Sequence, residues 1–242
     1  MKKSNRLDVE LVERRLVESR EKARALILAG QVLVDGQKVD KAGQQVAGES
    51  RIELISQPRY VGRGGLKLEA ALEHFRIPVA GKVCLDVGSS TGGFTDCLLQ
   101  HGAARVYAID VGTGQLDWKL RNDPRVVVAE QVNARYLSRE HMGEPIDLAV
   151  CDVSFISVTL ILPAVSGLLA SNAEMVILVK PQFELAKHQV SRGGVIRDPA
   201  LHQQACQRVE EAVRQIGFRS EMIASPVLGA EGNQEFLLYA RH

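Results

Sequence analysis

Four charged residues stand at the edges of apolar segments, where a side chain could do acid–base chemistry. Asp152 follows the run "LAVC", Lys180 follows "MVILV", Glu235 precedes "FLLYAR", and Lys67 lies in the helical pattern "GGLKLEAAL". Because a buried and unpaired ion is unfavourable, we expect such residues to pair with one another. A lysine whose pKa is lowered by burial and by a like-charged neighbour could accept a proton from a hydroxyl group, with a carboxylate to orient it. Taken singly, each of the four fits a structural salt bridge better, and only the four together favour chemistry.

A glycine-rich stretch, "DVGSSTGGF" at 86–94, follows the apolar run "KVCL". Gly88 permits a sharp exit from a strand, and Gly92 and Gly93 let the backbone approach a ligand because they carry no Cβ. Asp110 ends the next strand-like run, "ARVYAID", where a carboxylate can accept hydrogen bonds from two ribose hydroxyls. This spacing predicts a site for a nucleoside cofactor.

Two nucleoside cofactors fit such a loop, NAD and S-adenosylmethionine. The glycine spacing differs from the G-x-G-x-x-G of NAD sites, and no residue pattern suggests hydride chemistry, so we favour S-adenosylmethionine. The expected cofactor contacts are Asp86, Gly88, Ser89, Ser90, Gly92, Gly93, Phe94, Asp110 and Asp152.

The elements that must position these residues alternate along residues 64–242. Continuous apolar strands that alternate with helices predict a parallel sheet covered on both faces. The last two strands are too close in sequence for a helix between them, so we expect an antiparallel hairpin at one edge. The pattern favours an α/β fold with a Rossmann-like, seven-stranded sheet of the class I methyltransferase type. The strand-like runs are 82–88, 104–111, 125–131, 146–153, 174–180, 218–225 and 235–241, and the helical patterns include 92–102, 158–169 and 198–217.

Residues 1–60 predict a separate, small α+β domain of two helices and a sheet. Apolar residues recur at helical spacing in "LDVELVERRL", and Ser19 is placed to cap a second helix that ends before Gly30. "QVLVDGQKV" predicts a hairpin that turns at Asp35-Gly36, because both residues tolerate positive φ, and "SRIELI" predicts a further strand. The stretch "SQPRYVGRGG", 56–65, marks the boundary, with a linker at 61–63.

Charge is distributed unevenly along the chain, although the net charge is only +1. Residues 1–67 hold 14 Lys and Arg against 9 Asp and Glu, and residues 68–242 hold 16 against 20. This asymmetry suggests an appended nucleic-acid-binding module. The segment "RLDVELVERRLVESREKARALILAGQVLVDGQKVDKAG" resembles the S4 RNA-binding domain. The resemblance implies a basic face on RNA, whose phosphate contacts would come from Arg6, Arg14, Arg20, Lys22, Arg24 and Lys38.

Residues 64–242 resemble the FtsJ/RrmJ-like RNA 2′-O-methyltransferases. The stretch "DVGSSTGGF" matches that family's D-x-G-x-x-P-G-G-[WF] loop, except that Thr91 replaces the proline. Together with the S4-like segment, the pieces "RGGLKLEAAL", "CDVSFISVTLILP" and "LVKPQFE" make the chain similar to the haemolysin-A (TlyA) type of ribosomal RNA methyltransferase.

The resemblance implies roles for individual residues. A catalytic tetrad would be formed by Lys67, Asp152, Lys180 and Glu235. Within it, Lys180 would accept the proton of a ribose 2′-hydroxyl. Asn133, in "AEQVNARYL", would contact adenine. The resemblance also implies S-adenosylmethionine as the cofactor, ribosomal RNA or ribosomal subunits as the substrate, and cytidine as the modified nucleotide.

Three other functions are compatible with parts of the pattern: a noncatalytic RNA-binding assembly factor, a small-molecule methyltransferase and a membrane-active haemolysin. The apolar runs are shorter than the roughly 20 residues that cross a bilayer, and the N-terminus lacks the apolar stretch of a secretory signal. We therefore expect a cytoplasmic protein with no membrane role.

The remaining features predict less. The four cysteines show no C-x-x-C spacing, so neither a disulfide nor a metal site is expected. The basic loop 187–198 could grip RNA, act as a lid or be an ordinary surface loop. Nothing in the sequence specifies an oligomeric state.

Overall fold

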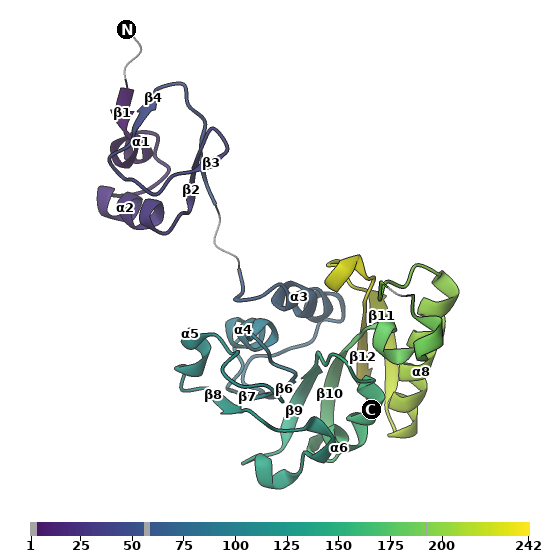
Figure 1. The fold of residues 1–242 in the computed structure, drawn as a ribbon. Helices are drawn as coiled ribbons and strands as arrows, with labels where there is room; N and C mark the ends of the chain where they lie inside the picture. Colours follow the sequence, from purple (N-terminus) through teal and green to yellow (C-terminus); the bar gives the residue numbers. More distant parts are fainter. Residues whose placement is uncertain (1–3, 56–58, 192) are drawn as a thin grey trace. The chain divides into compact units, whose positions relative to one another are not determined.

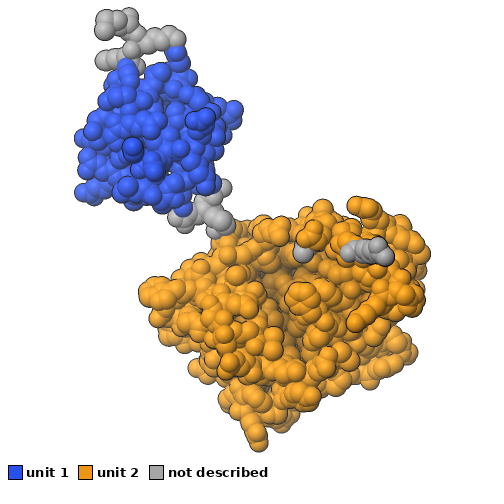
Figure 2. All heavy atoms as spheres, viewed as in Figure 1, with its two compact units in different colours: residues 1–58 blue, residues 59–242 orange. Residues whose placement is uncertain are grey.

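The computed structural model describes residues 4–55, 59–191 and 193–242, and the chain divides into two compact units, 1–58 and 59–242 (Figure 2). The division lies slightly earlier than the sequence suggested. Tyr60 is 2% exposed in the core of the second unit, and the amide of Val61 donates to Asp96 Oδ2 at 2.9 Å. Residues 59–63 therefore belong to the second unit rather than to a linker. Residues 56–58 of the expected boundary segment lie outside the described residues.

The first unit has the helices and the hairpin that its sequence predicts. Ser19 accepts a hydrogen bond from the Lys22 amide at the start of one helix, and Gly30 follows the end of that helix at a φ of 66°. Asp35 and Gly36 turn the hairpin with φ values of 50° and 80°. The elements are β1 Ser4–Arg6, α1 Leu7–Glu13, α2 Arg20–Leu28, β2 Val32–Val34, β3 Gln37–Lys38, β4 Gln45–Ala47 and β5 Ile52–Leu54. The pairing of β1 with β4 was not predicted, because neither segment has a clear alternation of apolar and polar residues.

The second unit is an α/β domain on a seven-stranded sheet, as predicted (Figure 1). Its strand order is β11-β12-β10-β9-β6-β7-β8, and β12 runs antiparallel to the other six strands of this sheet. The predicted hairpin of the last two strands is present. However, β12 lies inside the sheet, between β10 and β11, and β11 forms the edge. The strands are β6 Val83–Val87, β7 Arg105–Ile109, β8 Val126–Ala129, β9 Ile146–Cys151, β10 Leu169–Val179, β11 Arg219–Ala224 and β12 Phe236–Arg241.

Helices cover both faces of this sheet, which explains why its strands are continuously apolar. On one face, Leu68, Leu98 and Leu120 come from α3, α4 and α5 and share one core with the sheet. On the other, Leu162 and Val209 come from α6 and α8 and fill a second core. The helices are α3 Gly64–His74, α4 Gly93–Gln100, α5 Trp118–Arg121, α6 Leu162–Ser166, α7 Pro181–Glu184 and α8 Pro199–Gln215.

One helical prediction in this unit was too long. The pattern at 158–169 forms a 3₁₀ turn, Val158–Leu160, and the short helix α6, and the chain enters β10 at Leu169. Leu169 pairs with Ile146 of β9, so strand pairing overrides the helical periodicity at this point. Between β8 and β9 the chain forms the 3₁₀ turns Ala134–Tyr136 and Arg139–His141.

Candidate active site

A pocket of about 470 Å³ opens beyond the carboxyl ends of β6, β7, β8 and β9. Its lining comes from the segments that directly follow these strands, around Gly88, Asp110, Asn133 and Asp152. In the sheet, β7 and β9 flank β6 on opposite sides, so the pocket lies at the switch point where open α/β sheets bind ligands. A smaller hollow of about 110 Å³ shares Gly88 and Asp152 with the pocket and extends toward residues 62–64.

The structure brings most of the predicted cofactor contacts to these two hollows. Gly88, Ser90, Asp110, Asn133 and Asp152 line the pocket. A second set lines the smaller hollow: Ser89, Gly93 and Phe94. The other two predicted contacts line neither hollow, and they are Asp86, which is buried beneath the loop, and Gly92.

The glycines of the loop serve close packing as well as access. Gly88 has a φ of 85°, and a Cβ there would lie 2.4 Å from the carbonyl oxygen of Asp152. Gly92 has a φ of 97°, and its Cβ would lie 2.2 Å from Leu120. A Cβ on Gly93 would lie 3.0 Å from the amide nitrogen of Gly65. A Cβ at Gly92 or Gly93 would thus meet protein atoms, and Gly93 also lines the smaller hollow, so a close approach of a ligand to these glycines stays a prediction.

Two carboxylates organise the loop from below. Asp110 accepts hydrogen bonds from the amides of Ser90 and Gly112, each at 2.8 Å, and so ties the loop to the end of β7. Asp86 is fully buried and accepts a hydrogen bond from Thr95 Oγ1 at 2.6 Å, whereas its Oδ1 has no partner among the described residues. Burial raises the pKa of Asp86 to about 7, against the opposite effect of the Thr95 hydrogen bond.

The four charged residues predicted from the strand ends form two ion pairs. Lys180 Nζ lies 2.5 Å from Asp152 Oδ1 and donates to Ser154 Oγ at 2.8 Å. Lys67 Nζ lies 2.5 Å from Glu235 Oε2, and both side chains are nearly buried. Each cation thus has an anion, which lowers the cost of burial.

Sheet register and helix α3 bring the two pairs to the same rim. Antiparallel pairing of β10 with β12 ends at Val179 and Phe236, so the next residues, Lys180 and Glu235, emerge at one end of adjacent strands. Lys67 lies in the first turn of α3, which begins at Gly64. A Cβ on Gly64 would lie 3.8 Å from Asp152 Oδ2, so the start of α3 adjoins the other pair.

Helix α7 and the residue before it contact the loop after β9, and the sequence analysis did not predict these contacts. Lys180, just before the helix, holds Asp152 and Ser154, and the rings of Phe183 and Phe155 lie 5.4 Å apart between centroids. Phe155 is 88% exposed and has a φ of 66°, a strained value for an aromatic residue. These contacts fix the segment 152–156, all of which lines the pocket.

Glu184, at the end of α7, anchors the far side of the same loop. It is 2% exposed and accepts hydrogen bonds from Ser157 Oγ at 2.5 Å and from the amide of Val158 at 2.8 Å. Burial raises the pKa of Glu184, and the two hydrogen bonds act in the opposite direction. "CDVSFISV" and "LVKPQFE" are distinctive pieces of the sequence, but only the fold shows that they contact each other.

The basic loop 187–198 is held at its far end rather than free. Asn233 accepts a hydrogen bond from the amide of Ile196 at 3.0 Å and donates to the carbonyl of Gly194 at the same distance. His202 Nε2 lies 3.1 Å from the carbonyl oxygen of Ile196. These contacts argue against a lid formed by the whole loop; Arg192 lies outside the described residues.

The predicted RNA contacts of the first unit fall into three groups. Three arginines, Arg6, Arg20 and Arg24, converge on one buried carboxylate, Asp8. Arg14 is tied to Glu10 and to two backbone carbonyls, those of Gly48 and Ser50, so its guanidinium has a structural task. Lys22 pairs with Glu18 at 3.3 Å, and Lys38 is exposed on β3.

Comparison with known proteins decides the family. A model of the FtsJ-like methyltransferase matches residues 60–242, and a model of the S4 domain matches residues 5–52. The chain belongs to the FtsJ-like methyltransferase family. Its FtsJ-like unit contains the pocket and both ion pairs, and its S4 domain contains the arginine cluster.

Similar proteins cover the full length of this FtsJ-like chain. The Mycobacterium tuberculosis 16S/23S rRNA (cytidine-2′-O)-methyltransferase TlyA is 48% identical over 100% of this chain and 91% of its own length. A solved structure from Streptococcus thermophilus, named as a hemolysin, is 41% identical, with a TM-score of 0.75 over 100% of this chain and 89% of that chain. An S-adenosylmethionine-dependent methyltransferase structure from Listeria monocytogenes, 16% identical with a TM-score of 0.55 over 74% of this chain and 99% of that one, shares the fold.

Two kinds of feature are absent from the described residues. No group of three or more metal-binding side chains occurs within residues 4–55, 59–191 and 193–242. In the same ranges, no helix is both long enough and apolar enough to cross a membrane.

The four cysteines are free, and burial raises the pKa of each thiol.

Proposed function

We propose that this protein transfers a methyl group from S-adenosylmethionine to the 2′-hydroxyl of a ribose in ribosomal RNA. The observation that carries the proposal is the position of Lys180, whose Nζ is held by Asp152 and Ser154 at the rim of the pocket. The names of the relatives favour cytidine in the small and large subunit RNAs as the substrate nucleotide.

The pocket suits the proposed cofactor in shape and chemistry. A nucleoside fits its volume of about 470 Å³, and Asp110 and Asn133 offer oxygen and amide groups to ribose and base. The adjoining hollow beside Gly64 and Ser89 suits an amino-acid portion. The unpartnered Oδ1 of Asp86 beneath the loop suits a cationic group or an ordered water. When bound, S-adenosylmethionine supplies an activated methyl group.

The residues of the chain then need only to position the ribose and remove one proton. Once Lys180 has lost its own proton, its Nζ can accept the hydroxyl proton, while Asp152 and Ser154 fix its orientation. Lys67 and Glu235 hold α3 against the sheet and keep the site electrically balanced. The S4 domain supplies affinity for RNA through its arginines.

Methylation of ribosomal RNA by the purified protein tests this function. Ribosomal subunits from cells lacking the enzyme are incubated with S-adenosylmethionine, and the nucleosides are identified by mass spectrometry. We expect 2′-O-methylated cytidine with the wild type and none with Lys180→Ala. Methylation of a base would contradict the ribose assignment, and RNA binding without methylation would indicate an assembly factor. Leakage of liposomes caused by the pure protein would instead support a membrane-active haemolysin.

A further inference from the structure

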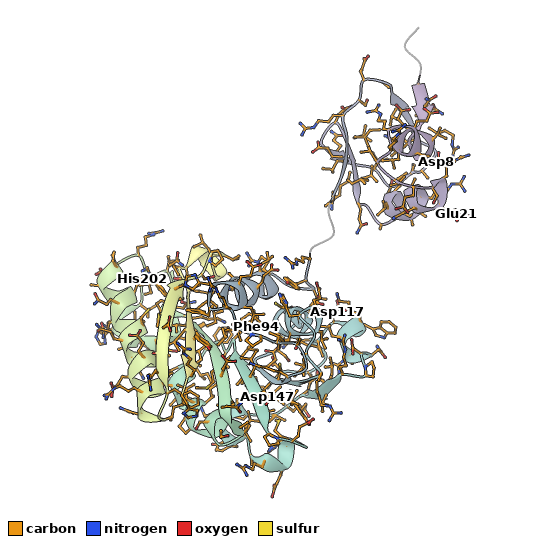
Figure 3. All side chains as sticks on the ribbon, turned by 180° about the vertical axis from the view of Figure 1, so that it is seen from behind. Asp8, Glu21, Phe94, Asp117, Asp147 and His202 are labelled. Carbon is orange, nitrogen blue, oxygen red and sulfur yellow. The ribbon has the colours of Figure 1, made fainter. Side chains whose placement is uncertain are left out.

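The S4 domain contains an arginine cluster built around a single carboxylate, labelled Asp8 in Figure 3. The Asp8 side chain is 0% exposed, and its oxygens accept hydrogen bonds from three guanidinium groups. Arg6 binds both oxygens, with Nε 3.0 Å from Oδ1 and Nη2 3.2 Å from Oδ2. Arg20 Nη2 lies 3.0 Å from Oδ2, and Arg24 Nε lies 3.2 Å from the same atom.

The cluster keeps a surplus of positive charge in contact with solvent. The hydrogen bonds from Arg6 have the largest effect on the pKa of Asp8 and hold it well below its usual range. The Asp8 carboxylate therefore stays ionised at working pH. Three cations therefore surround one anion. The side chains of Arg6, Arg20 and Arg24 remain 44%, 51% and 52% exposed. Each guanidinium has five N–H donors, and Asp8 takes two from Arg6 and one from each of the others.

This arrangement differs from the other basic residues of the domain. Arg14 spends its donors on Glu10 and on the carbonyls of Gly48 and Ser50, so little of it is available to a ligand. Lys22 forms an exposed pair with Glu18 that a phosphate can easily replace. In contrast to Arg14 and Lys22, the cluster on Asp8 combines fixed geometry, exposed donors and a net positive charge.

A fixed cluster binds an anion better than free arginines do, because the loss of side-chain freedom has already occurred on folding. The planar guanidinium forks match the oxygens of a phosphate group. We propose that Asp8 is a positioning residue, which holds Arg6, Arg20 and Arg24 as one receptor for a phosphate of the RNA backbone. The inference rests on the proposed function, since RNA is the ligand that this function assigns to the S4 domain.

Replacing the carboxylate separates this proposal from simple charge attraction. Asp8→Asn raises the net charge by one, so charge counting alone predicts tighter RNA binding. The proposal predicts the opposite sign: about five- to tenfold weaker binding of ribosomal RNA at physiological salt, because the guanidinium groups are no longer held together. The measurement is the dissociation constant of the full chain for a naked ribosomal RNA fragment, at several salt concentrations.

Glu10→Gln is the matched control. Glu10 lies on the same helix, is 7% exposed and pairs with Arg14, and the substitution makes the same change in net charge. We expect RNA binding by this variant to be unchanged or slightly tighter. If Asp8→Asn behaves like Glu10→Gln, the positioning role is excluded.

Because Asp8 is buried, a second set of variants covers the case in which Asp8→Asn does not fold. Arg6→Lys, Arg20→Lys and Arg24→Lys keep every charge and change exposed side chains only. They should each weaken RNA binding several-fold without lowering the melting temperature, since an ammonium cannot reproduce the guanidinium fork. Wild-type affinity in all three would overturn the proposal.

The same measurements distinguish failure of the inference from failure of the proposed function. If the wild type binds no ribosomal RNA, the proposed function fails. If the wild type binds and Asp8→Asn binds more tightly, only the inference fails. If Asp8→Asn binds naked RNA normally but loses affinity for intact ribosomal subunits, the cluster contacts a ribosomal protein instead of RNA. This result would also overturn the inference.

Discussion

Lys67 and Glu235 form an ion pair of 2.5 Å across a separation of 168 residues. The pair joins the first turn of α3 to the start of β12, and a Cβ on Gly229 would lie 2.0 Å from Glu235 Oε1, so the carboxylate is enclosed on that side too. Removing one partner would leave the other as a buried, uncompensated charge. The Lys67–Glu235 pair therefore stabilises the edge of the site. Asp152, which pairs with Lys180, lines the pocket itself.

Lys180→Ala should lower the single-turnover methylation rate by about 10²–10⁴-fold, the usual effect of losing a general base. Binding of the cofactor and of RNA should survive, because Lys180 lies in neither the pocket lining nor the arginine cluster, and Phe183 and Glu184 still hold the segment after β9. Rapid-quench methylation assays and separate binding measurements check this expectation.

Lys180→Arg is the control that separates catalysis from structure. A guanidinium keeps its proton at any working pH, so it can replace the ion pair with Asp152 but cannot accept a proton. We expect an inactive variant with a near-normal melting temperature. An active Lys180→Arg would show that the pair with Asp152 serves stability only.

Asp110→Ala should weaken S-adenosylmethionine binding by about 1–3 kcal/mol, through lost hydrogen bonds to the ribose. The structure adds a second reason, since Asp110 also holds the amides of Ser90 and Gly112. Calorimetry on the wild type and the variant measures the change. Asp123→Asn, which alters an exposed pair with Arg125, should bind the cofactor normally. Unchanged affinity in Asp110→Ala would remove this residue from the site.

The pH dependence of stability should carry a contribution from Asp86. Its pKa is about 7 in the folded protein against 3.8 for a free carboxyl, so the folded state binds the proton more tightly. The stabilisation is complete below pH 4, is lost as the pH rises toward 7, and changes no further above that; the loss is of the order of 4 kcal/mol. Asp86→Asn should remove this decline in urea denaturation at pH 4–8. An equally steep decline in the variant would assign it to another group.

Glu184→Ala should disturb the loop that follows β9. Ser157 and the amide of Val158 would lose their acceptor, at a cost of about 1–3 kcal/mol in the free energy of unfolding. Displacement of Asp152 and Ser154 should slow methylation by about 10²-fold. Glu184→Gln keeps an acceptor of the same length and should retain most of the activity. If both variants lose stability but neither loses turnover, Glu184 does not position the site.

Local patterns made much of the fold predictable. The Asp35-Gly36 turn and the glycine loop depend on residues adjacent in sequence, and the sheet strands are continuous apolar runs. Strand-end charges also placed Lys180 and Asp152 together, because the carboxyl ends of parallel strands share one edge. The sequence could not predict two kinds of tertiary contact. One is which strand of the hairpin, β11 or β12, pairs with β10, and the other is which carboxylate pairs with which arginine. Asp8 and Glu184 were therefore missed, since their burial arises only when distant segments meet.

Strand β12 is the last of the seven in chain order, yet it lies inside the sheet. While a ribosome is still synthesising the chain, β10 and β11 lack the neighbour that they share, and their backbone groups stay open to other strands. The sheet can close only once β12 has emerged, and Glu235 arrives with that strand. The ion pair between Lys67 and Glu235 therefore forms only after β12 has been made, whereas the pair between Lys180 and Asp152 needs no residue beyond Lys180.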